Sequence, residues 1–448
     1  MNIEEIFKAY DIRGLTDGQL TEEAARLIGS AFAAFVGADA VAVGYDIRHS
    51  SPGLAAAFRE GVNRQGVDVI DLGLMATDMI YYAAGALDMP GAMITASHNP
   101  KEYNGIKLCR EGAQPIGVDS GLTEIKALVL DPPPPADVPG TRSEKDVRAD
   151  YVNHLFEIVD ASVFTDMSVA VDAGNGMAGV VIERVFERIP SRLHGLYLDP
   201  DGDFPNHHPD PLRPENLEDL LREMDRGDFD LGVAFDGDAD RAFFIDDKGV
   251  ALPGSTTTAI AARWFLAREP GATIVHNLIC SKAVPETVEA LGGTAIRTRV
   301  GHSYIKEVMK DSGAIFGGEH SGHYYFRDNY RADSGMLAML VLMQVMAEDG
   351  RKLSEIRTEV DPYEQSGEIN FRVDDKEGMT ATIGETLGGE ADYLDGLTLT
   401  FDDSWLNLRA SNTEPVLRLN VEGPDQQAVD EIVGQVSAII SAAGGHRV

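Results

Sequence analysis

One pattern occurs three times along this chain, and it constrains the fold more than any other feature. Each copy begins with an apolar strand-like segment and a turn, continues through a helix-like segment and a second strand, and later adds a strand that ends in a polar loop. The three loops read TASHNP (95–100), DGDADR (236–241) and GGEHSGH (317–323). This alternation predicts three α/β units of one topology, each with a largely parallel sheet. The alternative is that loosely similar pieces arise in any α/β protein.

The three loops are expected to meet over one cleft. Each follows a strand-like segment, GAMI, LGVAF or GAIF, at its carboxyl end. Ligands of open α/β sheets bind beyond the carboxyl ends of the strands. Equivalent loops from three units therefore predict one shared site.

Changes in sequence character divide the chain into four predicted domains. The proline-rich DPPPPADVPG (131–140) is interpreted as a surface connection that closes the first unit, with an ordinary rigid loop as the alternative. From about residue 365, short strand-like segments and one amphipathic helical pattern predict a smaller α+β domain. The predicted domains are 1–149, 150–251, 252–364 and 365–448.

The balance of charge limits the class of partner. The sequence has 38 Lys and Arg against 73 Asp and Glu, a formal net charge of −35. Such a field repels nucleic acids and anionic membranes, so neither is expected as a partner, and an anionic substrate requires a locally basic cleft. No apolar run approaches the roughly 18 residues of a membrane span. Because Cys109 and Cys280 lie in no metal-like spacing and the segment MNIEEIFKAYDIRG does not resemble a signal peptide, we expect a reduced, cytoplasmic location.

The loop DGDADR predicts a metal site. It places Asp236, Asp238 and Asp240 at every second position after a strand-like segment, which turns three carboxylates toward one point. Hard oxygen ligands of this kind suit Mg²⁺. An EF-hand does not fit, because Arg241 stands where that loop requires glycine. A solvated acidic turn is the plain alternative.

Two further loops carry groups that could bind a phosphorylated sugar. In GGEHSGH, Glu319 and Ser321 can bind neighbouring hydroxyls and His323 can move a proton near pH 7. Zinc binding by His320 and His323 is an alternative without a recognised spacing, and an incidental glycine-rich turn is another. The loop RASNTEP combines a cation, hydroxyls and turn amides, which can form a phosphate site or only a turn between strands; its predicted ligands are Arg409, Ser411, Asn412 and Thr413.

The loop TASHNP raises the question of a nucleophile. Ser97 is beside His98, but serine is a weak nucleophile unless a base or metal activates it. The segment GHSYI (301–305) lacks the second glycine of a hydrolase elbow, and no P-loop motif is present. The segment DAGNGMAG (172–179), with Asp199 near the end of the next strand, leaves a nicotinamide-dependent oxidoreductase as a rival, although a structural turn is the favoured interpretation.

Five motifs in order, FKAYDIRG, TASHNP, DGDADR, GGEHSGH and RASNTEP, together resemble the α-D-phosphohexomutases, in particular their bacterial phosphomannomutase/phosphoglucomutase branch. The resemblance covers nearly the whole chain. It implies three topologically similar α/β domains with mixed, largely parallel sheets and a C-terminal α+β domain of TATA-binding-protein-like form.

The resemblance also implies residue roles. Ser97 is the phosphorylated serine, and one of its phosphate oxygens binds Mg²⁺ together with the three aspartates. Arg13 and Arg241 stabilise the moving phosphoryl group. Lys107 and His323 act as general acid and base, and burial near cations is expected to lower the pKa of Lys107.

The remaining implied roles concern the substrate. His98 supports the serine loop, Glu319 and Ser321 contact the 3- and 4-hydroxyls, and the RASNTEP ligands bind the phosphate that is not transferred. The resemblance also implies a substrate-binding role for four residues whose flanking sequence is less diagnostic: Tyr10, Lys282, Gly301 and His302.

The implied reaction moves a phosphoryl group between the 1- and 6-positions of a hexose phosphate through a hexose 1,6-bisphosphate, which is intermediate and activator. Mannose phosphate is the expected substrate and glucose phosphate the second. His320 departs from the Met or Gln of related mutases, which leaves phosphoglucosamine mutase open. A non-catalytic sugar-phosphate binding protein is the alternative of another class. The chain is expected to act as a monomer or homodimer.

Overall fold

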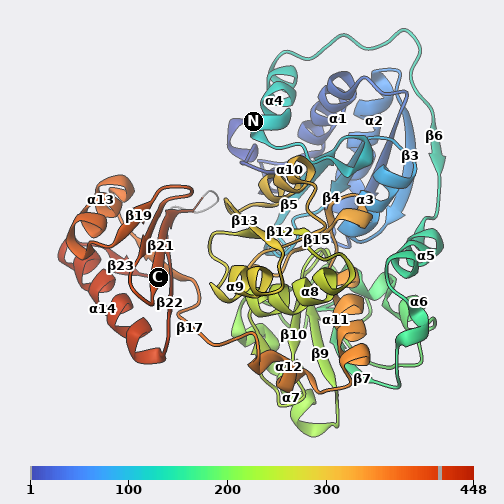
Figure 1. Cartoon of the computed structure of the whole chain (residues 1–448). Helices are drawn as coiled ribbons and strands as arrows, with labels where there is room; N and C mark the ends of the chain where they lie inside the picture. Colours follow the sequence, from blue (N-terminus) through green and yellow to red (C-terminus); the bar gives the residue numbers. More distant parts are fainter. Residues whose placement is uncertain (1–2, 412–415) are drawn as a thin grey trace.

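Four β-sheets with their helices organise the computed structural model, which describes residues 3–411 and 416–448 (Figure 1). The first three sheets and their helices pack together, and the fourth lies to one side of them (Figure 1). Among the described residues, no helix has both the length and the apolar character needed to cross a bilayer.

The first unit has a six-stranded sheet. Its strands, in spatial order, are β1 (Ile12–Leu15), β5 (Tyr103–Cys109), β4 (Gly91–Ile94), β2 (Ala40–Tyr45), β3 (Asp68–Leu74) and β6 (Arg142–Glu144). Its helices are α1 (Glu22–Val36), α2 (Ser51–Arg64), α3 (Thr77–Ala86) and α4 (Leu122–Leu130). The hydroxyl of Thr21 caps the start of α1, and Gly37, with φ of 62°, ends it in the left-handed region that favours glycine.

The second and third units each have a five-stranded sheet. The second has β11 (Ala251–Leu252), β10 (Ala242–Ile245), β9 (Leu231–Phe235), β7 (Ser168–Asp172) and β8 (Arg192–Leu196), with α5 (Arg148–Ile158), α6 (Ile182–Phe186) and α7 (Glu218–Arg226). The third has β13 (Thr294–Thr298), β12 (Thr273–Asn277), β14 (Phe316–Gly318), β15 (Tyr324–Phe326) and β16 (Ala332–Asp333), with α8 (Gly254–Arg268), α9 (Ala283–Ala290), α10 (His302–Ser312), α11 (Gly335–Asp349) and α12 (Leu353–Thr358).

The predicted repeat is confirmed by the strand order. Each sheet contains a parallel trio, β3-β2-β4, β8-β7-β9 or β13-β12-β14. In each, one further strand then pairs antiparallel with the last of the trio: β5, β10 or β15. Mixed, largely parallel sheets of one topology therefore occur three times.

The C-terminal unit has an antiparallel sheet, as expected of an α+β domain. Its strands are β19 (Glu390–Asp392), β20 (Leu397–Thr400), β21 (Trp405–Ala410), β22 (Leu417–Gly423), β18 (Ile369–Arg372) and β23 (His446–Arg447), with β17 (Glu364–Gln365) beside β22. Helices α13 (Lys376–Leu387) and α14 (Gln426–Ala442) pack on it. The apolar face of α14 buries Val429, Val436 and Ile440, because these residues recur at helical spacing.

The connection at 131–140 follows the predicted surface course but leads to a strand that we did not predict. It passes around the outside of the first unit (Figure 1), where the N–H groups of Ala136 and Gly140 donate to Arg64 O and Asn63 O, each at 2.8 Å. It then continues into β6 at the sheet edge. The predicted boundaries near 149, 251 and 364 fall within α5, β11 and β17 and not between elements. The domain limits stay a prediction.

One apolar core joins the first three units. It includes Met79 of the first, Val171 of the second and Phe316 of the third, all fully buried. Helix α11 is buried on nearly all sides within this core and contacts both α8 and β10. This shared core fixes the loops of the three units relative to one another.

Candidate active site

The three predicted loops do meet. Ser97 Oγ of the first unit donates to Asp236 Oδ2 of the second at 2.7 Å. His323 of the third unit forms an isolated backbone bridge with Arg241, and its Nε2 lies 3.6 Å from Asp240 Oδ1. The three loops that follow the carboxyl ends of the strands therefore lie together, as expected.

The TASHNP loop (95–100), called the serine loop here, holds Ser97 in an uncommon backbone conformation. Its φ is +50°, in the left-handed region that non-glycine residues seldom adopt, and its N–H donates to Thr95 Oγ1 at 2.9 Å. His98 Nδ1 lies 3.2 Å from Ser97 Oγ. Burial, together with the charges of Arg241 and Arg13, lowers the pKa of His98 well below its usual value. The imidazole beside the serine is therefore neutral, in keeping with a supporting role.

The predicted metal loop forms a buried carboxylate cluster. Oxygens of Asp236, Asp238 and Asp240 lie within 4.8 Å of one another, and all three residues are at most 1% exposed. Burial, then repulsion from its two neighbours, raises the pKa of Asp236. Asp238 Oδ1 and Asp240 Oδ1 are buried and accept no hydrogen bond from the described residues. A set of hard oxygen donors with unused lone pairs fits Mg²⁺.

Lys107 corrects one expectation. Its Nζ lies 2.7 Å from Asp238 Oδ2 and 2.5 Å from Asp240 Oδ2. Burial works to lower its pKa, but these two carboxylates outweigh burial and the net shift is upward. The expectation of a pKa lowered by nearby cations is therefore wrong, because the nearest charges are the anions Asp238 and Asp240. Lys107 is therefore an ammonium in this structure.

The two predicted arginines both lie close to the serine loop, where burial and then their charges lower the pKa of His98. Arg241 is buried, and its Nε donates to Asp236 Oδ2 at 2.9 Å. Arg13 donates to Asn99, two residues after Ser97, and to Asp11 at 2.5 Å. Arg241 Nη2 and Arg13 Nε are buried without a hydrogen-bond acceptor among the described residues. Both side chains thus retain donors for an anion.

Arg48 also lies at the site, although its residue type and position in the sequence did not single it out. It is fully buried, and its Nη2 donates to the carbonyl of Ser97 at 2.6 Å. The available signal was its place in GYDIRHSS, directly beyond the carboxyl end of β2, at the edge of the sheet where the serine loop lies.

The GGEHSGH loop, which is predicted to bind the sugar, makes hydrogen bonds to other residues of the protein. Glu319 is buried and accepts from Asn277 Nδ2 at 3.0 Å, from Gly301 N–H at 3.2 Å and from the Tyr325 hydroxyl at 2.5 Å. A sugar hydroxyl would compete with these donors. Ser321 Oγ lies 3.0 Å from His323 Nδ1.

His320 is separate from that pair. Its Nδ1 lies 3.0 Å from Ser255 Oγ, and burial lowers its pKa to about 4. Among the described residues, no group of potential metal ligands contains both His320 and His323, so the zinc alternative gains no support.

The remaining predicted residues connect units. Tyr10 donates its hydroxyl to Val300 O at 2.8 Å, and a Cβ on Gly301 would lie 2.6 Å from the Tyr10 ring. The ring of His302, at the start of α10, lies 5.6 Å from that of Tyr10. These three residues therefore join the first and third units.

Lys282 and the RASNTEP loop involve the C-terminal unit. Lys282 Nζ donates to Asp403 O, and its N–H donates to Glu422 Oε1, each at 3.0 Å. Arg409 is buried and donates to Glu368 Oε2 at 3.1 Å. Ser411 N–H donates to Val416 O at 3.0 Å, whereas Asn412 and Thr413 lie outside the described residues.

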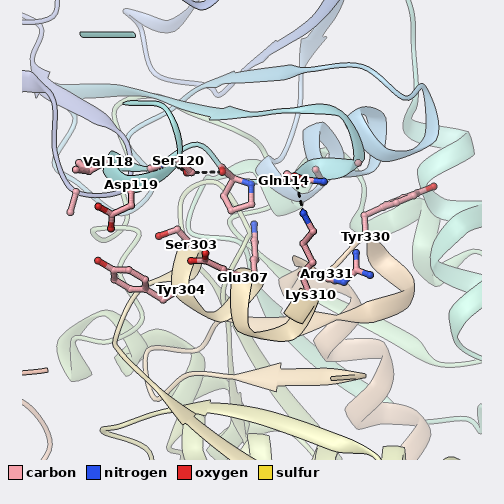
Figure 2. Close-up of a pocket in the computed structure, with 16 residues that line it drawn as sticks. Gln114, Val118, Asp119, Ser120, Ser303, Tyr304, Glu307, Lys310, Tyr330 and Arg331 are labelled. Carbon is pink, nitrogen blue, oxygen red and sulfur yellow. Dashed lines mark hydrogen bonds between the residues drawn. The ribbon is translucent and has the colours of Figure 1, made fainter. Parts of the chain in front are cut away.

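A cavity lies between the first and third units. It has a volume of about 210 Å³ and separates a loop of the first unit from α10 (Figure 2). Val118, Asp119 and Ser120 face Ser303, Glu307 and Lys310 across it. None of the predicted site residues that the structure describes lines this cavity.

The glycine-rich segment after β7 is a structural turn. A Cβ on Gly176 would lie 2.7 Å from Gly237 O, and one on Gly179 would lie 1.8 Å from Leu198 O. The segment leads into a four-residue 3-10 helix, Met177–Val180. A dinucleotide site needs a full helix whose N-terminus faces the pyrophosphate, and this short helix does not provide one.

Comparison with known proteins identifies the family. Models described as phosphoglucomutase/phosphomannomutase alpha/beta/alpha domains I, II and III match residues 4–131, 149–249 and 253–363, and the model of the C-terminal domain matches 368–439. A Xanthomonas campestris protein described as "Phosphohexose mutases" is 40% identical over 423 residues, 93% of this chain and 94% of its own. A phosphomannomutase of Escherichia coli K12 is 39% identical over 429 residues, with the same coverage.

Solved structures agree in fold. A phosphoglucomutase/phosphomannomutase family protein from Burkholderia thailandensis has a TM-score of 0.91 at 31% identity and covers 99% of this chain and 98% of its own. At 14% identity, an Aspergillus fumigatus N-acetylphosphoglucosamine mutase in complex with GlcNAc-6P and magnesium shares the fold, with a TM-score of 0.62 over 98% of this chain and 96% of its own. The chain therefore belongs to the phosphoglucomutase/phosphomannomutase family of hexose phosphate mutases, which are isomerases.

Proposed function

We propose that this enzyme interconverts hexose 1-phosphate and hexose 6-phosphate through a phosphorylated Ser97. The observation that carries the proposal is the 2.7 Å contact of Ser97 Oγ with Asp236, within the carboxylate cluster. A hydrolase would need a base beside the serine, and a buried neutral His98 that lacks a carboxylate partner among the described residues lacks the third member of a triad. A serine that carries a phosphoryl group needs neutralisation of charge instead.

Mg²⁺ is the proposed metal, held by Asp236, Asp238, Asp240 and a phosphoserine oxygen. When bound, it supplies neutralisation of the negative charge of the transferring phosphoryl group. The Aspergillus relative solved with magnesium supports this choice. In the structure, the ammonium of Lys107 occupies two of the same carboxylates, so metal and lysine compete for them.

The reaction has two balanced halves. Phosphoserine gives its phosphoryl group to a free hydroxyl of the sugar phosphate; the Ser97 O–P bond breaks, a new sugar O–P bond forms and the hydroxyl loses its proton. In this half the Ser97 oxygen takes up a proton. The hexose 1,6-bisphosphate then turns in the cleft; its other sugar O–P bond breaks, a new O–P bond forms to Ser97 Oγ as the serine hydroxyl loses its proton, and the released sugar oxygen takes up a proton. Lys107, an ammonium in this structure, would donate a proton to a departing oxygen, and His323 would accept the proton of an attacking hydroxyl. Arg13 and Arg241, with their unused donors, would bind the transferring phosphate.

The sugar is proposed to be mannose phosphate, with glucose phosphate second. Relatives at about 39% identity that are described as phosphomannomutases support this order. Glu319 and Ser321 would bind sugar hydroxyls, and Arg409, Ser411, Asn412 and Thr413 would bind the phosphate that is not transferred. Tyr10, His98, Lys282, Gly301 and His302 would complete the cleft.

Phosphorylation of Ser97 is the first test. We expect the intact protein, after incubation with glucose 1,6-bisphosphate and Mg²⁺, to gain one phosphate that maps by mass spectrometry to the peptide containing Ser97. Ser97→Ala should lose activity by at least about 10⁴-fold, because the phosphoryl carrier is removed. Ser143→Ala, on the exposed strand β6, is the control and should keep activity.

Assays with mannose, glucose and glucosamine 1-phosphate side by side test the substrate. Phosphate on another residue, or full turnover by Ser97→Ala, would refute the mechanism. A phosphorylated protein that turns over none of the three sugars would instead favour the binding-protein alternative.

A further inference from the structure

One buried arginine holds the serine loop through its backbone. Arg48 Nη2 donates to Ser97 O at 2.6 Å and to Asn99 O at 2.7 Å, and Nη1 donates to Pro100 O at 2.8 Å and to Tyr103 O at 3.2 Å. Its Nε donates to Asp46 Oδ2 at 3.1 Å. Three carbonyls of the serine loop and the carbonyl of Tyr103, the first residue of β5, thus converge on one planar guanidinium.

This contact opposes a conformational cost. A left-handed φ in a residue other than glycine costs roughly 1–2 kcal/mol, so Ser97 at +50° needs support from its surroundings. Arg48 donates to the Ser97 carbonyl from the first unit. A Cβ on Gly237 would lie only 2.4 Å from the same oxygen, so the second unit packs directly against it. The Ser97 carbonyl is therefore fixed between two units.

The second unit also covers the arginine. The ring of Phe204 lies 5.3 Å from the Arg48 guanidinium carbon. A Cβ on Gly202 would lie 2.6 Å from Ile47 O, which shows how closely this cover fits. The unit that carries the carboxylate cluster therefore also encloses the group that orients the serine.

We propose that Arg48 is a positioning residue for phosphoryl transfer. It fixes the backbone of Ser97, so that Oγ keeps one direction toward the carboxylate cluster while the bisphosphate presents each of its ends in turn. Arg48 acts through the loop and does not contact the sugar, because all of its nitrogens are engaged with protein acceptors. This inference rests on the proposed role of Ser97 as the phosphoryl carrier.

Arg48→Lys tests the inference. Lysine keeps the charge, but its single ammonium has three donors and cannot satisfy four carbonyls and a carboxylate. A displacement of about 1 Å at a reacting atom can cost about 100-fold in rate. We expect the single-turnover rate of transfer from phosphorylated Ser97 to glucose 1-phosphate to fall by about 100-fold, while the KM for glucose 1-phosphate stays within about threefold of wild type.

Arg59→Lys is the matched control. Arg59 is also buried in the first unit, and its Nη1 donates to Asp71 Oδ1 at 3.0 Å, away from the serine loop. It should lower the melting temperature in the same way without changing the transfer rate. Equal loss of rate in the two variants would overturn the inference, because it would reduce the effect of Arg48 to general stability.

The outcomes separate this inference from the proposed function. A wild-type rate in folded Arg48→Lys, with Ser97→Ala inactive, overturns the role of Arg48 alone. Absence of phosphate on Ser97 in the wild type overturns the proposed function first. If Arg48→Lys does not fold, Phe204→Leu carries the test, because it only loosens the cover of the guanidinium: a fall of about threefold to tenfold in rate at unchanged KM supports the inference, and an unchanged rate overturns it.

Discussion

Asp78 connects three units through one carboxylate. It lies in the first turn of α3, is 1% exposed and accepts from the hydroxyl of Tyr151 in α5. It also accepts from Ser334 Oγ, which caps α11, at 2.8 Å. Burial raises the pKa of Asp78 from 3.8 to about 7, and the hydroxyl donors only partly oppose this shift. The protonation of Asp78 therefore affects the hydrogen bonds that connect the three units and, through them, the stability of the fold.

The raised pKa of Asp78 predicts how stability depends on pH. Between about pH 4 and pH 7, the folded chain keeps a proton on Asp78 that the unfolded chain has released, so unfolding releases a proton and stability falls as pH rises. This contribution amounts to about 1.4 kcal/mol per pH unit in that window and is constant above it. We expect Asp78→Asn, which stays neutral, to remove the corresponding part of the slope. Denaturant unfolding of both proteins from pH 4.5 to 8 measures the difference, and parallel pH profiles would contradict the prediction.

At the scale of single residues, the sequence predicts which side chains lie near one another at the ends of strands. It predicts the burial and the neighbouring charges of those side chains less well. The contacts of Ser97 with Asp236 follow from the carboxyl ends of two strands. The pKa of Lys107 could not be predicted, because its two carboxylate partners are 131 and 133 positions away in the sequence and only the fold brings them together. Arg48 was missed because nothing local in YDIRHSS indicates complete burial.

At the scale of elements, the close packing of two loops fixes the position of Ser97 relative to the carboxylate cluster. The loop after β4 and the loop after β9 touch where Gly237 faces the carbonyl of Ser97. The added methyl group of Gly237→Ala must displace backbone rather than a flexible side chain. We expect a fall of at least tenfold in kcat, with a loss of about 1–3 kcal/mol in stability from overpacking.

Gly434→Ala is the matched control for that variant. Gly434 lies on α14, is exposed, and a Cβ there would meet no atom within 4 Å. Activity should be unchanged and stability equal or higher by up to about 1 kcal/mol, because alanine favours the helix. A Gly237→Ala variant with the activity of Gly434→Ala would contradict close packing of the two loops.

Elements with a strong apolar pattern were predictable, and weakly patterned ones were not. The parallel strands and the amphipathic pattern of α14 are visible in the sequence. Strand β6 reads RSE, with all three residues exposed, so no periodicity marks it. Helix α13 buries only Met379 and Ile383, which is too few to show a helical repeat. Both depend on the rest of the fold for their structure.

The net charge acts on the whole molecule. A formal charge of −35 distributes repulsion over the surface of the folded chain, and dissolved salt screens it. The Debye length falls from about 30 Å at 0.01 M to about 8 Å at 0.15 M ionic strength. Most of the reduction in charge repulsion therefore occurs over this range of salt concentration. We expect the melting temperature to rise by several degrees over this range at pH 7.5.

A control at lower pH isolates the charge effect. Near pH 5, close to the pI of about 4.5, protonation reduces the net charge, so the same addition of salt should raise the melting temperature less. An equal rise at both pH values, or none at pH 7.5, would show that repulsion does not limit stability.

The active centre draws on segments far apart in the chain. Ser97 contacts Asp236 across 139 positions, and His323 approaches Asp240 from the third unit. A ribosome that has completed the first unit has therefore made Ser97, Arg13 and Lys107, but neither the carboxylate cluster nor His323. If the proposed site is correct, we expect the growing chain to be inactive toward sugar phosphates until His323, more than two thirds of the way along the chain, has been made. On the proposed mechanism, the order of synthesis therefore makes catalysis depend on assembly of all three α/β units, and we expect a chain truncated before the third unit to be inactive.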